Sequence, residues 1–161
     1  MKLVRYGEVN AEKPGLIDSG GTLRDLSDHI SDIDGSVLGN ATIDRLSELT
    51  PENLPVVKGA PRLGACVGSV GKLICIGLNF HEHAKETGNP VPEHPIVFMK
   101  ATSAINGPFD DVVLPRGSQH SDWEIELGVV IGERAKYVDA ADALAHVAGY
   151  CVVNDISERF Y

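Results

Sequence analysis

Short apolar runs, separated by glycine, proline and polar residues, dominate the hydrophobic pattern of this chain. In the first 60 residues these runs predict short strands, two of which flank Gly20-Gly21, a pair that can close a hairpin. We expect strands at 2–6, 15–18 and 22–25, and a helix from about Thr42 to Leu49 that ends before Pro51. This stretch predicts a small β-rich unit, and nothing in it suggests chemistry.

A connecting segment with Pro51, Pro55 and Pro61 separates this unit from a second one. The second unit opens with the apolar run 72–78, which predicts a buried strand. Further strands are expected at 96–100, 123–131 and 148–153, and a helix at 140–147. The fold class is therefore predicted to be α+β, with a small N-terminal β-rich domain at 1–65 and a second domain at 66–161.

The net charge and the lengths of the apolar runs exclude some classes of binding partner. The 161 residues have a formal net charge of −9, so the chain offers no basic stripe for nucleic acid or an anionic membrane surface. No apolar run reaches membrane-spanning length, and the N-terminal residues do not resemble a signal peptide. We therefore expect a soluble, cytoplasmic protein.

The three cysteines are Cys66, Cys75 and Cys151. Their number is odd and no two of them have CxxC spacing, so neither a disulfide framework nor a zinc cluster is indicated. We expect reduced, mostly buried thiols.

Acidic and apolar residues alternate between Asp122 and Val130. Because side chains on a strand alternate between its two faces, Asp122, Glu124 and Glu126 are expected on one face. Neighbouring carboxylates on that face stand about 7 Å apart, so two of them can reach one cation. The alternative is a half-solvated strand whose outer face is polar.

A third acid, Asp155, follows the apolar strand 148–153 and could point into the same site. Three oxygen ligands without Cys or His suit Mg²⁺, or else Mn²⁺ or Ca²⁺, better than zinc. On its own, however, Asn154-Asp155 is also typical of a turn or a helix cap.

A second group of candidate catalytic residues lies between Gly77 and Gly88. Asn79 and Glu82 are spaced as a capping box for a short helix, which Gly88 would end. His83 and Glu86 are then i and i+3 and share a face, so the carboxylate can orient an imidazole that takes a proton from water. The alternative is a solvated surface helix. His120, which precedes the acidic strand, could line the same site.

These segments resemble, in order, successive blocks of the fumarylacetoacetate hydrolase family. The similarity covers roughly residues 70–161, and residues 1–60 resemble the short N-terminal domain of bacterial members more weakly. The matching blocks are 76–88, 95–100, 122–127 and 153–159.

The resemblance implies a mixed β-roll, of which this chain would form the first part, and commonly a homodimer. It implies that Glu124, Glu126 and Asp155 bind a divalent cation, Mg²⁺ (or Mn²⁺ or Ca²⁺), and that His83 and Glu86 are the acid-base pair. Lys100 and Arg159 would contact the substrate.

The implied reaction is hydrolysis or lyase cleavage of a C–C bond in a 2-oxo acid or acylpyruvate-like substrate, through a metal-stabilised enolate. Among bacterial members, the sequence most resembles ureidoglycolate lyases and 2,4-diketo-3-deoxy sugar acid hydrolases. Ureidoglycolate lyase activity is therefore an alternative. Family members continue beyond the Asn-Asp block, so we expect this chain to be the front part of a longer protein. A non-catalytic fragment that only binds metal is the other alternative.

Overall fold

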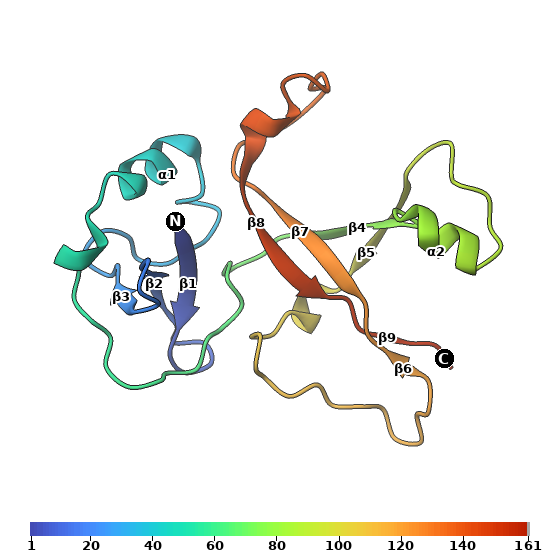
Figure 1. The fold of residues 1–161 in the computed structure, drawn as a ribbon, viewed down its shortest axis with the longest axis horizontal. Helices are drawn as coiled ribbons and strands as arrows, with labels where there is room; N and C mark the ends of the chain where they lie inside the picture. Colours follow the sequence, from blue (N-terminus) through green and yellow to red (C-terminus); the bar gives the residue numbers. More distant parts are fainter. Residues whose placement is uncertain (161) are drawn as a thin grey trace. The chain divides into compact units, whose positions relative to one another are not determined.

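Two units make up the structure, a computed structural model that describes residues 1–160 (Figure 1). The larger unit joins Met1–Gly68 with Asn106–Tyr161, and the smaller comprises Ser69–Ile105. Each unit is described by itself. The predicted domain boundary at residues 65 and 66 stays a prediction.

The larger unit begins with a three-stranded antiparallel sheet in the order β1-β2-β3. A turn that begins at Asp18 closes the predicted hairpin, and the Asp18 carboxylate accepts hydrogen bonds from the backbone of Gly20 and Thr22, at 3.0 and 2.8 Å. Gly21 adopts a φ of 82°, which favours glycine. The strands are β1 (Lys2–Tyr6), β2 (Lys13–Ile17) and β3 (Leu23–Asp25).

The buried core lies against this sheet. The helix α1 (Asn40–Ser47) and the 3₁₀ turn η1 (Pro51–Asn53) follow the sheet. Val130 and Ala148, far along the chain, also pack against the core, which therefore holds the C-terminal strands to the N-terminal region. The buried residues are Leu16, Leu26, Ile30, Ile33, Leu38, Leu46 and Leu54.

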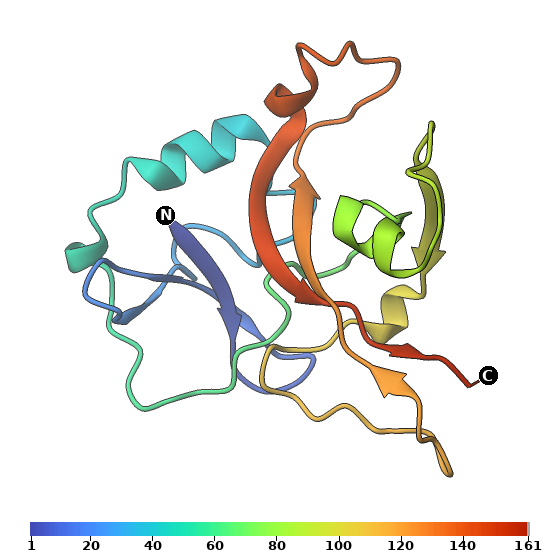
Figure 2. The ribbon, with the colours of Figure 1, turned by 45° about the vertical axis from the view of Figure 1, so that its right-hand side comes forward.

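The C-terminal part of this unit is a long antiparallel hairpin of β7 (Ile125–Ile131) and β8 (Val147–Asn154). Figure 2 shows the two strands side by side, in orange and red. The short strands β6 (Ser121–Asp122) and β9 (Ser157–Glu158) pair beyond its open end. The hairpin thus places the predicted acidic residues close to where its two strands begin and end.

The helix predicted at 140–147 is wrong. Only one 3₁₀ turn, η3 (Ala143–His146), forms there. The carbonyl oxygen of His146 accepts hydrogen bonds from the backbone of Gly132 and Glu133, at 2.9 and 3.3 Å, and β8 begins at the next residue. The composition of this segment favours a helix, but its last residue, Val147, pairs as the first residue of β8.

The smaller unit pairs β4 (Leu73–Gly77) antiparallel with β5 (Ile96–Lys100). The helix α2 (His81–Glu86) lies between them in sequence, and the 3₁₀ turn η2 (Thr102–Ala104) follows. The predicted capping box is wrong, because Phe80 is the N-cap residue and its side chain makes no capping hydrogen bond. Gly88 follows the helix with a φ of 69°, as its predicted role requires.

The structure confirms a small, β-rich α+β fold. Within residues 1–160, no helix has both the length and the apolar character needed to cross a membrane.

Gly132 lies where the β7–β8 hairpin meets the N-terminal core, and we expect Gly132→Ala to destabilise the protein by about 1 to 3 kcal/mol. An added Cβ would collide with the carbonyl oxygen of Leu38 and stand 2.8 Å from Ala148 Cβ. Gly149→Ala is the matched control, because a Cβ at Gly149 meets nothing within 4 Å. Urea unfolding of the two variants measures the difference, and equal midpoints would contradict this account of Gly132.

Candidate functional site

The predicted site residues fall into two groups, one in each unit. Glu124, Glu126, Asp155 and Arg159 lie in the larger unit, and His83, Glu86 and Lys100 lie in the smaller. The meeting of the two groups in one site stays a prediction.

The β7 strand has the predicted alternation from Ile125 on, but Asp122, which was predicted on the same face, lies in the separate strand β6 and is exposed. Glu126, Gly128 and Val130 lie on its less exposed face, while Ile125 and Leu127 are exposed on the other. Glu124, just before the strand, is half-buried like Glu126. This pattern fits two glutamates on one face, although the apolar face is the more exposed of the two.

Asp155 is the backbone neighbour of Glu124 across the hairpin. Its N–H donates to the carbonyl oxygen of Glu124 at 2.8 Å, and the Glu124 N–H donates to Asn154 Oδ1 at 3.3 Å. Two of the three predicted ligands therefore lie opposite each other where β7 begins and β8 ends. The two sequence motifs, considered separately, do not predict that Glu124 and Asp155 are neighbours across the hairpin.

Arg159 forms ion pairs with two of the acidic residues. Its Nε donates to Asp122 Oδ2 at 2.7 Å, and its Nη2 donates to Glu124 Oε1. The hydrogen bond from Arg159 lowers the pKa of Asp122, and the same contact raises the pKa of the guanidinium. The side chains of both Asp122 and Arg159 are 47% exposed. These carboxylates thus converge on one positive charge at the surface.

A second acidic group beside this cluster was missed by the sequence analysis. Glu158, on β9, accepts hydrogen bonds from Ser118 Oγ and, at 2.7 Å, from Ser121 Oγ. These bonds lower the pKa of Glu158.

The His120 ring stacks on Phe160 with 5.7 Å between centroids, and the His120 carbonyl accepts the Arg159 N–H at 3.0 Å. Of these residues, the sequence indicated only His120 as a candidate site residue, through its position before the acidic strand.

A hollow of about 190 Å³ adjoins the acidic cluster. Its wall is mostly apolar, and Asp122 supplies its only acidic side chain. The lining residues are Val112, Leu114, Ser121, Asp122, Trp123 and Ile156. The hollow could hold a small organic group next to Asp122.

No metal-binding cluster is formed by the side chains of residues 1–160, counting groups of three or more His, Cys, Asp or Glu. The donor chemistry nevertheless fits a hard cation. All three predicted ligands are carboxylates, which Mg²⁺ and Ca²⁺ prefer, and Glu124 already binds a positive group. The predicted three-ligand site therefore stays a prediction that the residue types support.

The predicted acid-base pair lies on the exposed side of α2. Ala84 is the buried residue of this helix, whereas His83 and Glu86 are exposed. The two side chains form no hydrogen bond or ion pair with each other in the described helix. Lys100, at the end of β5, is half-buried. The helix leaves both side chains accessible to solvent but does not hold them together.

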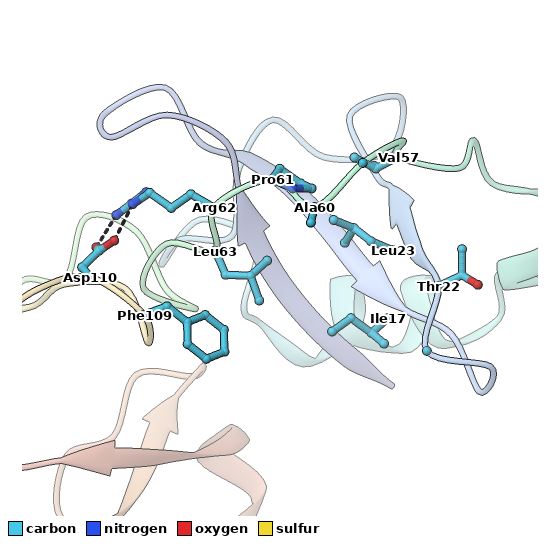
Figure 3. Close-up of a pocket in the computed structure, with 12 residues that line it drawn as sticks. Ile17, Thr22, Leu23, Val57, Ala60, Pro61, Arg62, Leu63, Phe109 and Asp110 are labelled. Carbon is cyan, nitrogen blue, oxygen red and sulfur yellow. Dashed lines mark hydrogen bonds and ion pairs between the residues drawn. The ribbon is translucent and has the colours of Figure 1, made fainter.

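Another hollow in the larger unit, of about 740 Å³, lies elsewhere (Figure 3). The lining residues are Ile17, residues 21–23, Val57, residues 59–63, Phe109 and Asp110. At one end Arg62 donates two hydrogen bonds to Asp110, at 2.7 and 2.6 Å. No predicted site residue lines this hollow, and its two charged residues, Arg62 and Asp110, form an ion pair with each other.

Comparisons with known proteins connect these features to a family. Residues 72–161 match the family model described as fumarylacetoacetate (FAA) hydrolase, C-terminal. A Burkholderia orbicola protein named "Putative hydrolase" is 58% identical over 159 residues, which cover 99% of this chain and 56% of that protein. The chain therefore spans about half the length of the curated relatives it matches.

Solved structures show the same likeness. Fumarylacetoacetate hydrolase from Exiguobacterium antarcticum is 28% identical, with a TM-score of 0.76 over 99% of this chain and 57% of that one. The 5-carboxymethyl-2-hydroxymuconate delta-isomerase from Mycobacterium smegmatis is 26% identical, with a TM-score of 0.66 over 99% of this chain and 55% of that one.

Proposed function

Because this chain belongs to the fumarylacetoacetate hydrolase family, we propose that it is part of a divalent-metal-dependent hydrolase or lyase. The proposed substrate is a 2-oxo acid or acylpyruvate, and the proposed reaction is cleavage of a C–C bond. The observation that supports this most directly is the acidic cluster at the end of the β7–β8 hairpin, where Glu124 binds a cationic group beside Asp155.

The names of the solved relatives support an acidic substrate. The delta-isomerase is named for a muconate with a carboxymethyl group, and another relative, from Mycobacterium marinum, is named for a heptadiene-dioate. Both names describe substrates with carboxylates. We propose that Arg159 and Lys100 bind a substrate carboxylate, because each supplies a positive charge near the predicted site segments.

Enzymes of this family are generally dependent on a divalent metal. In the proposed site Glu124, Glu126 and Asp155 would hold Mg²⁺, or else Mn²⁺ or Ca²⁺. When bound, the ion would supply positive charge that stabilises the oxygen on which negative charge develops as the C–C bond breaks.

We assign the proton transfers to His83. Its neutral imidazole would take a proton from the attacking water, and Glu86 would orient the ring and stabilise its protonated form. The exposed position of both side chains on α2 leaves them accessible to substrate. The finer alternatives within this proposal are the ureidoglycolate lyase and 2,4-diketo-3-deoxy sugar acid hydrolase reactions.

A second candidate is metal binding without catalysis. One observation favours it: in the described helix α2, His83 and Glu86 form no hydrogen bond or ion pair with each other, so the proposed acid-base pair is not preassembled. Saturable Mg²⁺ binding without turnover of any tested substrate would indicate this function.

The test is a turnover screen of the longest available form of the protein with acylpyruvates, oxaloacetate and ureidoglycolate in the presence of Mg²⁺ or Mn²⁺, coupled to calorimetric metal titration. We expect one substrate class to react, and Glu126→Gln to weaken metal binding at least about 10-fold. Asp139→Asn is the matched control, since Asp139 is an exposed acid outside the cluster. Equal affinities for wild type and Glu126→Gln would remove Glu126 from the site, and no turnover of any substrate would reject the proposed reaction.

A further inference from the structure

The side chain of Glu158 fastens β9 to the chain that precedes β7. Its Oε2 accepts hydrogen bonds from the hydroxyl groups of Ser118 and, at 2.7 Å, Ser121. Its Oε1 accepts the backbone N–H of Phe160 at 2.9 Å. Glu158 and both serines are half-buried, and Ser121 lies opposite Glu158 in the β6–β9 pair. One carboxylate therefore joins β9 to β6 and to the residues just before β6.

These hydrogen bonds satisfy the charge of Glu158 without a cation. The two serine oxygens stand 2.9 Å apart, and each hydroxyl has a single proton, which it donates to the carboxylate. The two bonds lower the pKa of Glu158, and the Phe160 N–H contributes in the same direction. The carboxylate is thus ionised and already occupied, although the next residue in the chain, Arg159, carries a positive charge.

Arg159 binds a separate set of partners. Its backbone N–H donates to the His120 carbonyl oxygen at 3.0 Å, and its guanidinium binds Asp122, at 2.7 Å, and Glu124. The backbone of Arg159 is therefore held by its own hydrogen bond and, one residue earlier, by the contacts of Glu158. Because the Arg159 side chain is 47% exposed, this fixed backbone limits where the guanidinium can reach.

We propose that Glu158 is a positioning residue for Arg159. Held by its two serine partners, Glu158 fixes the backbone at a point from which the guanidinium reaches the acidic cluster. The inference rests on the proposed function in one respect, namely that the positioned guanidinium binds a carboxylate of an acylpyruvate. A guanidinium that is already in place loses less side-chain entropy on binding that carboxylate. Glu158 therefore strengthens substrate binding and takes no part in the chemical step.

Nuclear magnetic resonance of the complete enzyme, isotope-labelled at arginine, tests the positioning without any substrate. The Nε–H of Arg159 is hydrogen-bonded to Asp122, so its signal should be shifted from those of free arginines and should exchange slowly with water. The signal that disappears in Arg159→Lys identifies it. We expect Glu158→Ala to move this signal to the free-arginine position and to speed its exchange at least about 10-fold.

A second route to the same loss is the double variant Ser118→Ala/Ser121→Ala, which removes both donors and keeps the carboxylate. Glu158→Gln, whose amide oxygen still accepts from the serines, should lie between wild type and Glu158→Ala. Glu48→Ala is the matched control, since Glu48 is an exposed acid at the end of α1, and it should leave the Arg159 signal unchanged. Thermal unfolding shows that each variant is folded at the temperature of measurement.

Turnover of acetylpyruvate, a small acylpyruvate, tests the role in substrate binding. We expect Glu158→Ala to raise KM about 10-fold while kcat stays within a few-fold of wild type, because an interaction made equally in the ground and transition states is weakened. No turnover by the wild type would reject the proposed reaction, whereas the Arg159 signal would still decide the positioning.

The proposal is overturned if folded Glu158→Ala, or the folded double serine variant, keeps the wild-type Arg159 signal. It is also overturned if Glu158→Gln loses as much as Glu158→Ala, or if Glu158→Ala lowers kcat at an unchanged KM.

Discussion

Replacing His83 with alanine is expected to lower turnover of the complete enzyme by about 100- to 10,000-fold, the usual contribution of a general base. In the proposed mechanism His83 activates water and does not bind the metal. Metal affinity should therefore remain close to wild type in a calorimetric titration. A loss of turnover with unchanged metal binding separates a catalytic base from a ligand.

His81→Ala is the matched control for this prediction. His81 lies on the same helix and is equally exposed, but residues at i and i+2 point in different directions. We expect its rate to stay within a few-fold of wild type, and Glu86→Gln to give a smaller loss than His83→Ala. Wild-type rates in His83→Ala would instead indicate that α2 is a solvated surface helix.

Residues 1–161 expressed alone are expected to self-associate and to show no measurable turnover. The outward face of the β7–β8 hairpin is apolar, and Ile125, Leu127 and Val152 are 69%, 64% and 77% exposed. Exposed strands and apolar patches of this kind recruit other chains or aggregate. The relatives are almost twice as long, so in them additional polypeptide is available to cover such a face.

Light scattering, thermal unfolding and acylpyruvate turnover measure this outcome on one preparation. A form of the length of the relatives is the comparison, and it should be less aggregated and active. Val152→Thr in the short form is a second comparison, since it keeps the strand while reducing the apolar surface. A cooperative, monomeric and active product of residues 1–161 would contradict this prediction.

Local pattern was sufficient to predict most of the strands. The predicted bounds of β1 and β5 agree with the structure, because apolar runs between turn residues determine both. The helix α1 begins two residues before the predicted start. Glu133 accepts a hydrogen bond from the Asn40 backbone at 2.9 Å across 93 residues, and no local pattern contains that contact.

The site was only partly predictable for the same reason. The alternation of Glu124 and Glu126 is local, whereas the pairing of Asp155 with Glu124 depends on the register of β7 and β8. Arg159 was predicted to contact substrate, yet in the structure it binds Asp122 and Glu124.

The ion pair between Arg159 and Glu124 makes the arginine a tethered competitor of any cation that uses this glutamate. A group held on the same chain acts at a high effective concentration, so the measured metal affinity would be the difference between two competing equilibria. A substrate carboxylate that draws the guanidinium away would release Glu124 and tighten metal binding. By linkage, metal would then strengthen substrate binding by the same factor.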